Sequence, residues 1–369
     1  MMRVWGVGLV LAVAVAGAQE TARDWQIGPF TRPATGNPVI APNAASVFED
    51  PIRGAPVHWE ALHTFNPAAV VRNGKIDALY RAEDNTGKME IGGHTSRLGL
   101  AESEDGIHFT RRAAPAFYPA KDGQESREWP GGVEDPRIVE AEDGTYVLTY
   151  TQWNWKTYSV GIATSTDLEH WTKHGPAFFE AKGGKYAKLK YKSAGIVTTL
   201  RDGKVLAARI HGQYWMYWGE GAIHLATSGD LIHWTPVEDK RGEPIEVLRP
   251  RPGHFDSSFP EVGPPPVLTK RGIVVIYNGK NAATGGDPDL APATYAAGEA
   301  LFDADDPARL LAQTEHPVLK PELQYERTGQ YAAGTTFAEG LVYFHDRWFL
   351  YYGCADSLVS VATAPGAGR

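Results

Sequence analysis

The sequence predicts an all-β protein, and more specifically a five-bladed β-propeller, from three observations. A strand-and-turn pattern recurs, with Ser103, Ser165 and Ser228 at equivalent positions 62 and 63 residues apart. Glycine and proline supply 40 and 26 of the 369 residues, a composition typical of many short strands joined by turns. After the N-terminal segment, no stretch of useful length carries the 3.6-residue apolar spacing of a helix.

The repeated unit is an alternating strand, a Ser-x-Asp turn and an aromatic residue. Its clear copies are 98–109, 160–171 and 223–234, a weaker copy lies at 297–303, and a last strand is expected at 358–363. Five units of about four strands each, repeated radially, predict a propeller. The regular spacing disfavours the alternative, a pair of β-sandwiches.

Further strands are expected between the copies, and each follows a charged turn. They are 76–80, 145–150, 273–277 and 348–352, and one short helix is expected at 306–313. Because the repeat exceeds the ~40–45 residues of a common propeller blade, the extra length is expected in loops on one face, where sites form.

The N-terminus predicts a cleavable signal peptide over residues 1–18. One arginine precedes an apolar run at 7–16, and small residues lead to cleavage after Ala18. Residues 19–369 are then expected to form a single catalytic propeller in the periplasm or outside the cell. No later run is long enough to insert into a membrane. Cys354 is the only cysteine, which excludes an internal disulfide.

Charge and motifs exclude several classes of partner. The net charge is −8 and no long Lys/Arg block exists, so nucleic acid is not an expected partner. His108, His170 and His233 recur with the repeated turn, so a structural role is expected. The chain has no His-Glu-x-x-His motif, phosphate-binding loop or serine elbow, and neither a metal nor a cofactor is expected to be required.

A carboxylate pair stands out at Glu134 and Asp135, directly before Pro136 and Arg137. Proline stiffens the turn that holds the pair, and the arginine could set the charge state of one carboxylate. From this segment alone, a structural Asp–Arg lock on the turn is an equally good interpretation.

Together with other segments, this motif resembles glycoside hydrolase family 130, the β-mannoside phosphorylases and β-mannosidases. The similarity extends from about residue 60 to 365. The matching segments are 66–67, 80–82, 96–99, 103–109, 132–138, 263–266 and 351–356. The resemblance implies a five-bladed propeller, in agreement with the repeats.

The resemblance also implies roles for individual residues. Asp135 would be the general acid, passing its proton through a hydroxyl of the bound mannose. The substrate-binding residues would be Asn66, Arg81, Arg97 and Asp356. Glycosidic cleavage needs such an acid at the leaving oxygen and an activated nucleophile on the opposite face of the sugar.

The choice between hydrolase and phosphorylase depends on charge. Phosphorylases of the family hold phosphate with cations, but Asn278 stands where they carry a histidine, and Tyr158 and Ser159 stand near the position of an arginine. Glu220 and Glu261, 41 residues apart, resemble the two glutamates of the family's β-1,2-mannosidases. Carboxylates repel phosphate and can deprotonate water.

We therefore expect an exported, inverting hydrolase of β-mannosidic linkages, β-1,2 above all, acting on manno-oligosaccharides. One of the two glutamates would be the base and the other would orient the water. Trp153 or Trp155 is expected to stack on the sugar.

Three alternatives stay open at this stage. The nearest alternative is a phosphorylase releasing mannose 1-phosphate. The hydrolase interpretation weakens if Lys192, Arg209 and His211 all face the pocket, although solvated strand ends are the favoured place for them. The chain is a non-catalytic sugar-binding propeller if Asp135 serves binding alone. The arabinan- and fructan-cleaving propellers are disfavoured, because the sequence offers no clear acidic residue at the start of a first-blade strand.

Overall fold

The protein is described by a computed structural model over residues 24–366, and the predicted signal peptide lies outside the described residues. The described part is all-β, as predicted. Its helical segments are single turns, α2 (Glu125–Glu128), α3 (Ala181–Gly184) and the 3-10 turn η1 (Gln324–Glu326). Between residues 24 and 366, no helix is long and apolar enough to cross a membrane.

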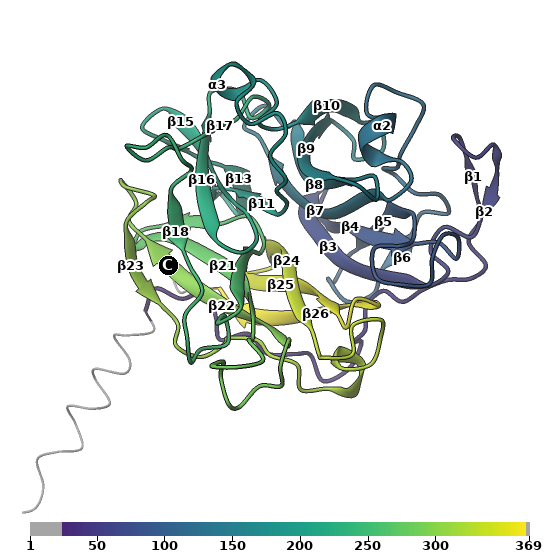
Figure 1. The fold of residues 1–369 in the computed structure, drawn as a ribbon. Helices are drawn as coiled ribbons and strands as arrows, with labels where there is room; N and C mark the ends of the chain where they lie inside the picture. Colours follow the sequence, from purple (N-terminus) through teal and green to yellow (C-terminus); the bar gives the residue numbers. More distant parts are fainter. Residues whose placement is uncertain (1–23, 367–369) are drawn as a thin grey trace, which may run out of the picture.

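Consecutive strands form antiparallel groups (Figure 1). The first group contains β3 (His63–Arg72), β4 (Lys75–Glu83), β5 (Ser96–Ser103) and β6 (Thr110–Arg111). The second contains β7 (Gly132–Glu140), β8 (Tyr146–Trp153), β9 (Tyr158–Ser165) and β10 (Thr172–Pro176). A small hairpin, β1 (Phe48–Asp50) and β2 (Ala55–Val57), precedes them.

The later groups follow the same plan with more irregular edges. The third contains β11 (Ala194–Ile196), β14 (Arg209–Ile210), β15 (Gln213–Trp218), β16 (Ile223–Ser228), β17 (Thr235–Pro236) and β18 (Glu246–Leu248). The fourth contains β19 (Phe259–Val262), β20 (Val267–Thr269), β21 (Gly272–Lys280), β22 (Tyr295–Phe302) and β23 (Leu310–Gln313). The last contains β24 (Thr336–Phe344), β25 (Arg347–Cys354) and β26 (Leu358–Pro365).

Two features join the groups to one another. The hairpin of β12 (Thr198–Arg201) and β13 (Lys204–Ala207) pairs in parallel with β20 and β7 and so connects the second and fourth groups. At the ends of the chain, Thr31 pairs with Thr363 and Ile40 with Val359, and β24 packs on β3. The hydrogen-bonded strands make four separate sheets, so closure into five blades stays a prediction.

The prediction of a helix at 306–313 is wrong. Asp303 accepts hydrogen bonds from the backbone N–H groups of Asp305 and Asp306, which turns the chain at this point. Residues 310–313 then run as strand β23 along the edge of β22. Pairing with an open sheet edge satisfies backbone groups that a short helix would leave unpaired.

The repeated turn has the same hydrogen bonds in its three clear copies. In the first copy, the Ser103 hydroxyl and the Asp105 carboxylate accept backbone N–H groups, and His108 Nδ1 lies 2.7 Å from Asp105 Oδ2. His170 and His233 pair with Asp167 and Asp230 at 2.8 and 2.7 Å. These histidines are exposed parts of the turn, which matches their expected structural role.

Aromatic packing fixes the segments that carry the later site residues. Phe178 stacks on Tyr191 with ring centroids 4.5 Å apart and meets Trp218 edge-on at 4.9 Å. Each buried side chain of this size stabilises the fold by roughly 1.5–3 kcal/mol. Tyr191 directly precedes Lys192, and Trp218 lies two residues before Glu220, so this core positions both side chains.

The first strands of three groups bulge at their ends. The register shifts between Phe65 and Pro67 in β3, between Glu134 and Arg137 in β7, and between Ala338 and Gly340 in β24. Asn66 and Asp135 sit in the first two bulges with φ of +46° and +48°. A bulge re-aims a side chain out of the pleat, and such strained backbone gathers at functional sites.

Candidate active site

A cavity of about 370 Å³ opens where the ends of the strand groups meet. It brings together most of the site residues predicted from the sequence. Those that line it are Asn66, Arg81, Asp135, Trp153, Glu220, Glu261 and Asp356.

Asp135 lies on the β7 bulge, and one of its carboxylate oxygens accepts two hydrogen bonds. Its Oδ1 accepts from Asn66 Nδ2 at 2.9 Å and from Arg81 Nη1 at 3.1 Å. Pro136 follows directly and fixes its own φ, which limits the freedom of the turn. The sequence order Glu-Asp-Pro-Arg thus places one carboxylate in the cavity on a stiff support.

Arg81 organises the negative charge around this point. Its guanidinium contacts Glu83 at 2.6 Å, Glu134 at 2.8 Å and Asp135 at 3.1 Å. Burial raises the pKa of Glu134 to about 7 although Arg81 opposes the shift. Burial acts on Asp135 as well, but Arg81 and Lys192 outweigh it and hold the pKa of Asp135 at about 2. Near neutral pH, the pair therefore keeps its proton on Glu134.

Arg137 lies behind the cavity and acts as a structural lock. It donates to the backbone carbonyls of Asp135 at 3.0 Å, Val262 at 2.7 Å and Gly263 at 3.1 Å. Its ion-pair partner is the buried Glu339, at 2.9 Å. Arg137 is therefore the residue that locks the turn in the Glu-Asp-Pro-Arg motif. It ties the backbone of Asp135 to strand β19, which carries Glu261.

Glu220 and Glu261 are neighbours across an antiparallel bridge and share one cation. Lys192 Nζ lies 3.0 Å from Glu220 Oε2 and 3.6 Å from Glu261 Oε1. The Ser193 hydroxyl donates to Glu261 Oε1 at 2.5 Å, and the buried Oε2 has no hydrogen-bond partner. Burial raises the pKa of Glu261 to about 7 although Lys192 opposes the shift.

The three basic residues considered for phosphate do not gather in this cavity. Lys192 lines it. The guanidinium of Arg209 donates to the backbone carbonyls of Gly212 and Gly229, and His211 Nε2 contacts the Asp305 carbonyl. The buried Asn278 exchanges two hydrogen bonds with the backbone of Ala338, so its amide is structural.

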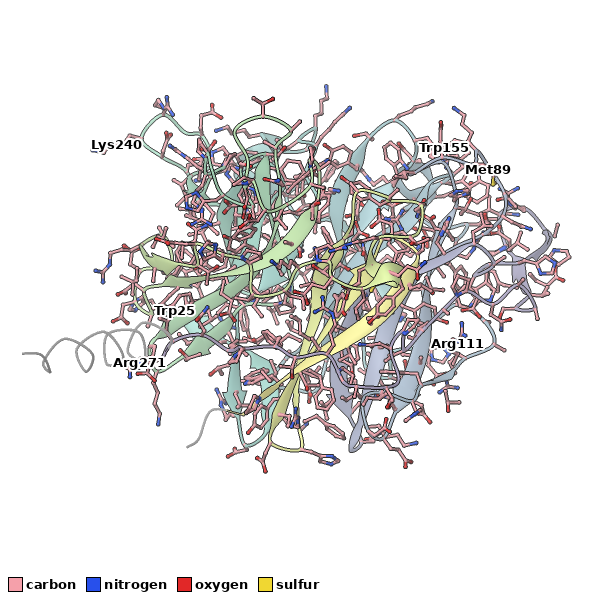
Figure 2. The ribbon with its side chains drawn as sticks, turned by 90° about the horizontal axis from the view of Figure 1, so that it is seen from below. Trp25, Met89, Arg111, Trp155, Lys240 and Arg271 are labelled. Carbon is pink, nitrogen blue, oxygen red and sulfur yellow. The ribbon has the colours of Figure 1, made fainter. Side chains whose placement is uncertain are left out.

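Aromatic side chains form much of the cavity wall. Trp153 is held by a hydrogen bond from its Nε1 to the Gly92 carbonyl at 3.0 Å. Trp155 lies outside the lining and is 37% exposed at the surface of the molecule (Figure 2). Of the two tryptophans proposed for stacking, Trp153 thus has the place for it. The other aromatic residues of the wall are Phe65, Tyr158, Tyr295, Tyr331 and Phe337.

Arg97 is the predicted substrate-binding residue that does not line the cavity. Its side chain is fully buried, where it pairs with Asp50 and with Asp84, the latter at 2.8 Å. Two buried carboxylates neutralise the guanidinium of Arg97, which is closed off from solvent. The ion pairs anchor the β1–β2 hairpin to β5. We leave Arg97 out of the sugar site for this reason.

Sequence reasoning missed Tyr295 and Tyr331 as wall residues and left Lys192 uncertain. Tyr295 begins strand β22 and precedes the weak fourth repeat copy, which was the only available signal. Tyr331 lies in a loop without a repeat pattern. Lys192 precedes β11, in a short irregular group whose register the sequence does not define.

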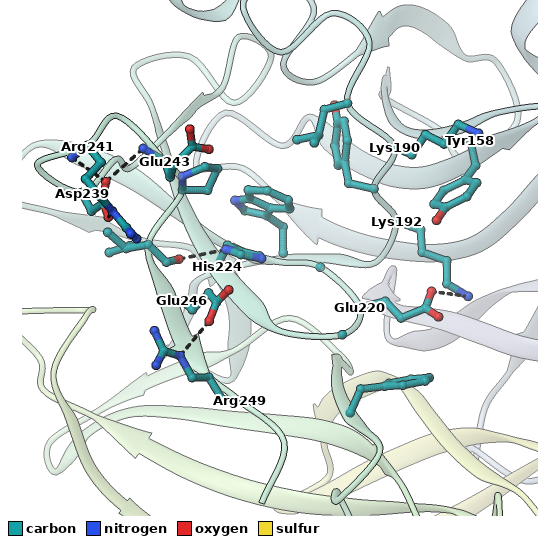
Figure 3. Close-up of a pocket in the computed structure, with 18 residues that line it drawn as sticks. Tyr158, Lys190, Lys192, Glu220, His224, Asp239, Arg241, Glu243, Glu246 and Arg249 are labelled. Carbon is teal, nitrogen blue, oxygen red and sulfur yellow. Dashed lines mark hydrogen bonds and ion pairs between the residues drawn. The ribbon is translucent and has the colours of Figure 1, made fainter. Parts of the chain in front are cut away.

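A larger cavity of about 780 Å³ adjoins the first one (Figure 3). The two share Tyr158, Lys192 and Glu220. Beyond these, its wall carries the stacked pair Trp218 and His224 and the ion pairs Asp239–Arg241 and Glu246–Arg249. Paired charges and aromatic faces together suit a polyhydroxylated ligand.

A cavity that combines several carboxylates with aromatic walls on an all-β scaffold suits a carbohydrate-active enzyme. The comparisons with known proteins agree. The model of glycoside hydrolase family 130, described as beta-1,4-mannooligosaccharide phosphorylase, matches residues 42–366. The chain therefore belongs to glycoside hydrolase family 130.

Some relatives within the family are named as phosphorylases and others as hydrolases. The 1,2-beta-oligomannan phosphorylase of Thermoanaerobacter sp. (strain X514) is 31% identical over 82% of this chain and 90% of its own. One solved structure was reported with family 130 hydrolases that target beta-1,2 mannosidic linkages in Candida mannan. It is 50% identical to this chain, has a TM-score of 0.91, and covers 92% of this chain and 94% of its own. A glycosyl hydrolase of Bacteroides ovatus is 49% identical, has a TM-score of 0.90, and covers 92% of this chain and 94% of its own.

Proposed function

We propose that this protein is an exported β-mannoside hydrolase that acts with inversion, and that its preferred linkage is β-1,2. The observation that carries the proposal is the pair Glu220 and Glu261, which faces the same cavity as Asp135. We also propose that the five strand groups close into a propeller. The pairing of residues 31–40 with β26 and the packing of β24 on β3 support that closure.

We infer a role for each carboxylate. Glu261 takes a proton from water, because a base with a pKa of about 7 is poised for that task near neutral pH. The resulting hydroxide equivalent bonds to the anomeric carbon while the bond to the leaving oxygen breaks. That oxygen receives the proton of a mannose hydroxyl, and Asp135 returns to this hydroxyl the proton that the Glu134–Asp135 pair holds, while Glu220 orients the water with Lys192.

The charge around the base disfavours phosphate. Among the residues that line this cavity, the lysine and arginine side chains are Lys192 and Arg81, and each is paired with carboxylates. A phosphate dianion beside Glu220 and Glu261 would meet like charge without an unpaired cation to hold it. The higher identity to the structures named as hydrolases, 49–50% against 31%, supports the same choice.

The adjoining cavity meets the first cavity at Glu220 and Lys192, where the nucleophile is activated, and continues along β15, β16 and β18. Because the nucleophile attacks the face opposite the leaving oxygen, this cavity lies on the side from which water reaches the anomeric carbon.

The second candidate function is phosphorolysis, which Lys192 favours because it is a cation beside the nucleophile position. Product analysis separates the two. We expect β-1,2-mannobiose to give free mannose at the same rate with and without phosphate. Mannose 1-phosphate appearing only with phosphate would overturn the hydrolase.

Two variants complete the test. Glu261→Gln is expected to lower kcat by on the order of 10²–10⁴, the usual contribution of general base catalysis. Asp135→Asn is expected to lose turnover by a similar factor while calorimetry still detects mannobiose binding. Full turnover by Asp135→Asn would leave only a binding role for that residue.

A further inference from the structure

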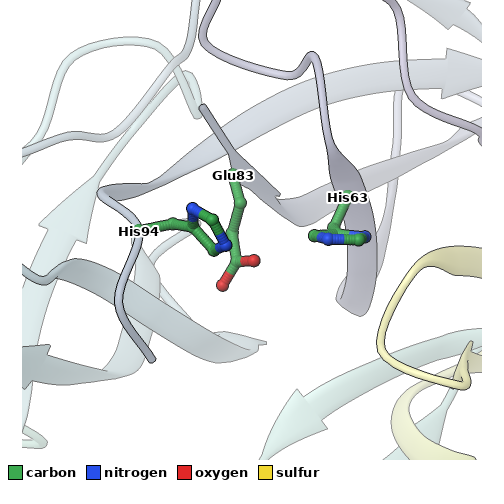
Figure 4. Close-up of side chains that lie close together, drawn as sticks. All are labelled: His63, Glu83 and His94. Atoms are coloured by element: carbon green, nitrogen blue, oxygen red, sulfur yellow. The ribbon is translucent and has the colours of Figure 1, made fainter. Parts of the chain in front are cut away.

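Two histidines and a glutamate converge beside the active-site cavity, outside the machinery described above. His63 on β3, Glu83 at the end of β4 and His94 in the following loop each offer a ligand atom, and these atoms lie within 4.8 Å of one another. Figure 4 shows the His94 ring turned toward the Glu83 carboxylate, with His63 on its other side. Glu83 and His94 are buried and His63 is half-buried.

The histidines are oriented through their other ring nitrogens. His63 Nδ1 contacts the Ser357 hydroxyl at 2.9 Å, and His94 Nδ1 contacts the Thr86 carbonyl at 3.3 Å. Metal-binding histidines are held in this way, with the second nitrogen on a backbone or side-chain oxygen that fixes ring and tautomer. Within residues 24–366 the hydrogen bonds of both rings are made by Nδ1, which leaves Nε2 as the atom available to a ligand.

The surroundings also favour a cation. The single guanidinium of Arg81 contacts Glu83, Glu134 and Asp135, and with the proton on Glu134 two ionised carboxylates still face this one cation. Gln330 Nε2 donates to Glu83 Oε2 at 3.1 Å and to the Asp356 carbonyl at 2.8 Å, which holds the Glu83 carboxylate in place beside the two histidines.

We propose that His63, Glu83 and His94 bind a divalent transition-metal ion of the zinc class. Two imidazoles and one carboxylate are a donor set that Zn²⁺ and its neighbours prefer, whereas Ca²⁺ and Mg²⁺ prefer oxygen alone. The ion would clamp residues 84–95, the loop between β4 and β5, to the β3–β4 hairpin. Because Ile91 and Gly92 of this loop line the sugar cavity, the ion would fix one wall of that cavity.

The first test measures binding without reference to activity or to the proposed reaction. The tag-free protein, stripped with a chelator, is titrated with Zn²⁺ by calorimetry and with Co²⁺ by visible absorption. We expect one tight equivalent and a Co²⁺ ligand-field band. His94→Ala and His63→Ala should each weaken binding by more than tenfold, and Ser357→Ala by roughly tenfold through the loss of ring orientation.

His233→Ala is the matched control, because this exposed histidine also pairs with a carboxylate but has no third ligand nearby. It should leave the affinity unchanged. Equal Zn²⁺ affinity in wild type and in both folded variants, His63→Ala and His94→Ala, would overturn the site, as would the absence of the Co²⁺ band.

A second measurement tests the clamp. Hydrogen exchange of the amides at 85–92 should slow when Zn²⁺ is added to the wild type and stay unchanged in His94→Ala. Exchange that does not respond to Zn²⁺ in the wild type would contradict the proposed effect on the cavity wall.

Discussion

Glu134 and Asp135 are adjacent in the chain and share the guanidinium of Arg81, yet their pKa values move in opposite directions. Arg81 Nη2 contacts Glu134 and Nη1 contacts Asp135, but only Asp135 also receives the amide of Asn66. Arg81 and Lys192, with a smaller contribution from Asn66, stabilise the ionised form of Asp135, whereas burial dominates at Glu134 and raises its pKa. The two residues titrate as a pair that holds one proton.

The Glu134–Asp135 pair predicts the pH range over which kcat/KM falls on the alkaline side. Since the pKa of Glu134 is about 7, the proton available to Asp135 is lost as the pH rises through that value. Glu134→Gln removes the protonatable group and keeps an oxygen for Arg81, so we expect kcat/KM to fall several-fold at pH 7 and its alkaline limb to shift. Profiles from pH 4 to 9 measure the effect, and identical limbs in both proteins would contradict it.

The acidic limb is predicted to belong to Glu261, which must be ionised to act as base. Its pKa of about 7 is held down by Lys192. Lys192→Met removes that cation, so the acidic limb of kcat/KM should move to higher pH by about one unit. Lys240→Met, on an exposed loop at the edge of the molecule (Figure 2), is the control and should leave the limb in place.

Gly353 is predicted to be essential to the placement of Asn66. A Cβ added at Gly353 would lie 2.2 Å from Asn66 Oδ1 and 3.0 Å from its backbone nitrogen. Gly353→Ala should therefore displace Asn66 from Asp135 and lower kcat/KM at least tenfold. Gly229→Ala, where a Cβ meets nothing within 4 Å, should change neither activity nor Tm. Full activity of Gly353→Ala would show that Asn66 does not position the acid.

A stability prediction comes from Glu299, which lies far from the cavity and accepts the Ile27 backbone N–H at 3.2 Å. Burial raises its pKa from 4.5 to about 7. The folded state therefore binds this proton more tightly than the unfolded chain, and the stabilisation present below pH 4.5 is lost as the pH rises through 7.

The loss attributable to Glu299 by pH 8.5 is about 3 kcal/mol in the free energy of unfolding. Glu299→Gln should remove this part of the pH dependence. Urea unfolding at pH 5 and pH 8.5 measures it, with the exposed Glu104→Gln as control. An unchanged slope between the two pH values in Glu299→Gln would refute the assignment.

The sequence named Asp135, Glu220 and Glu261 as site residues because their short motifs resemble those of the family, and all three line one cavity. The repeated Ser-x-Asp turn likewise predicted the strand groups, since its hydrogen bonds are local. Arg97 shows the limit of this reasoning: its motif matches, but its two buried partners, Asp50 and Asp84, are set by tertiary packing. The convergence of His63 and His94, 31 residues apart, has no local signature either.

The pairing of residues 31–40 with β26 ties the order of synthesis to the completion of the fold. Thr31 leaves the ribosome more than three hundred residues before its partner Thr363. Through nearly the whole of translation, the early segment and the group that it completes stay unpaired. This contact can form only after β26 has been made, so a chain without β26 would leave residues 31–40 without their partner strand.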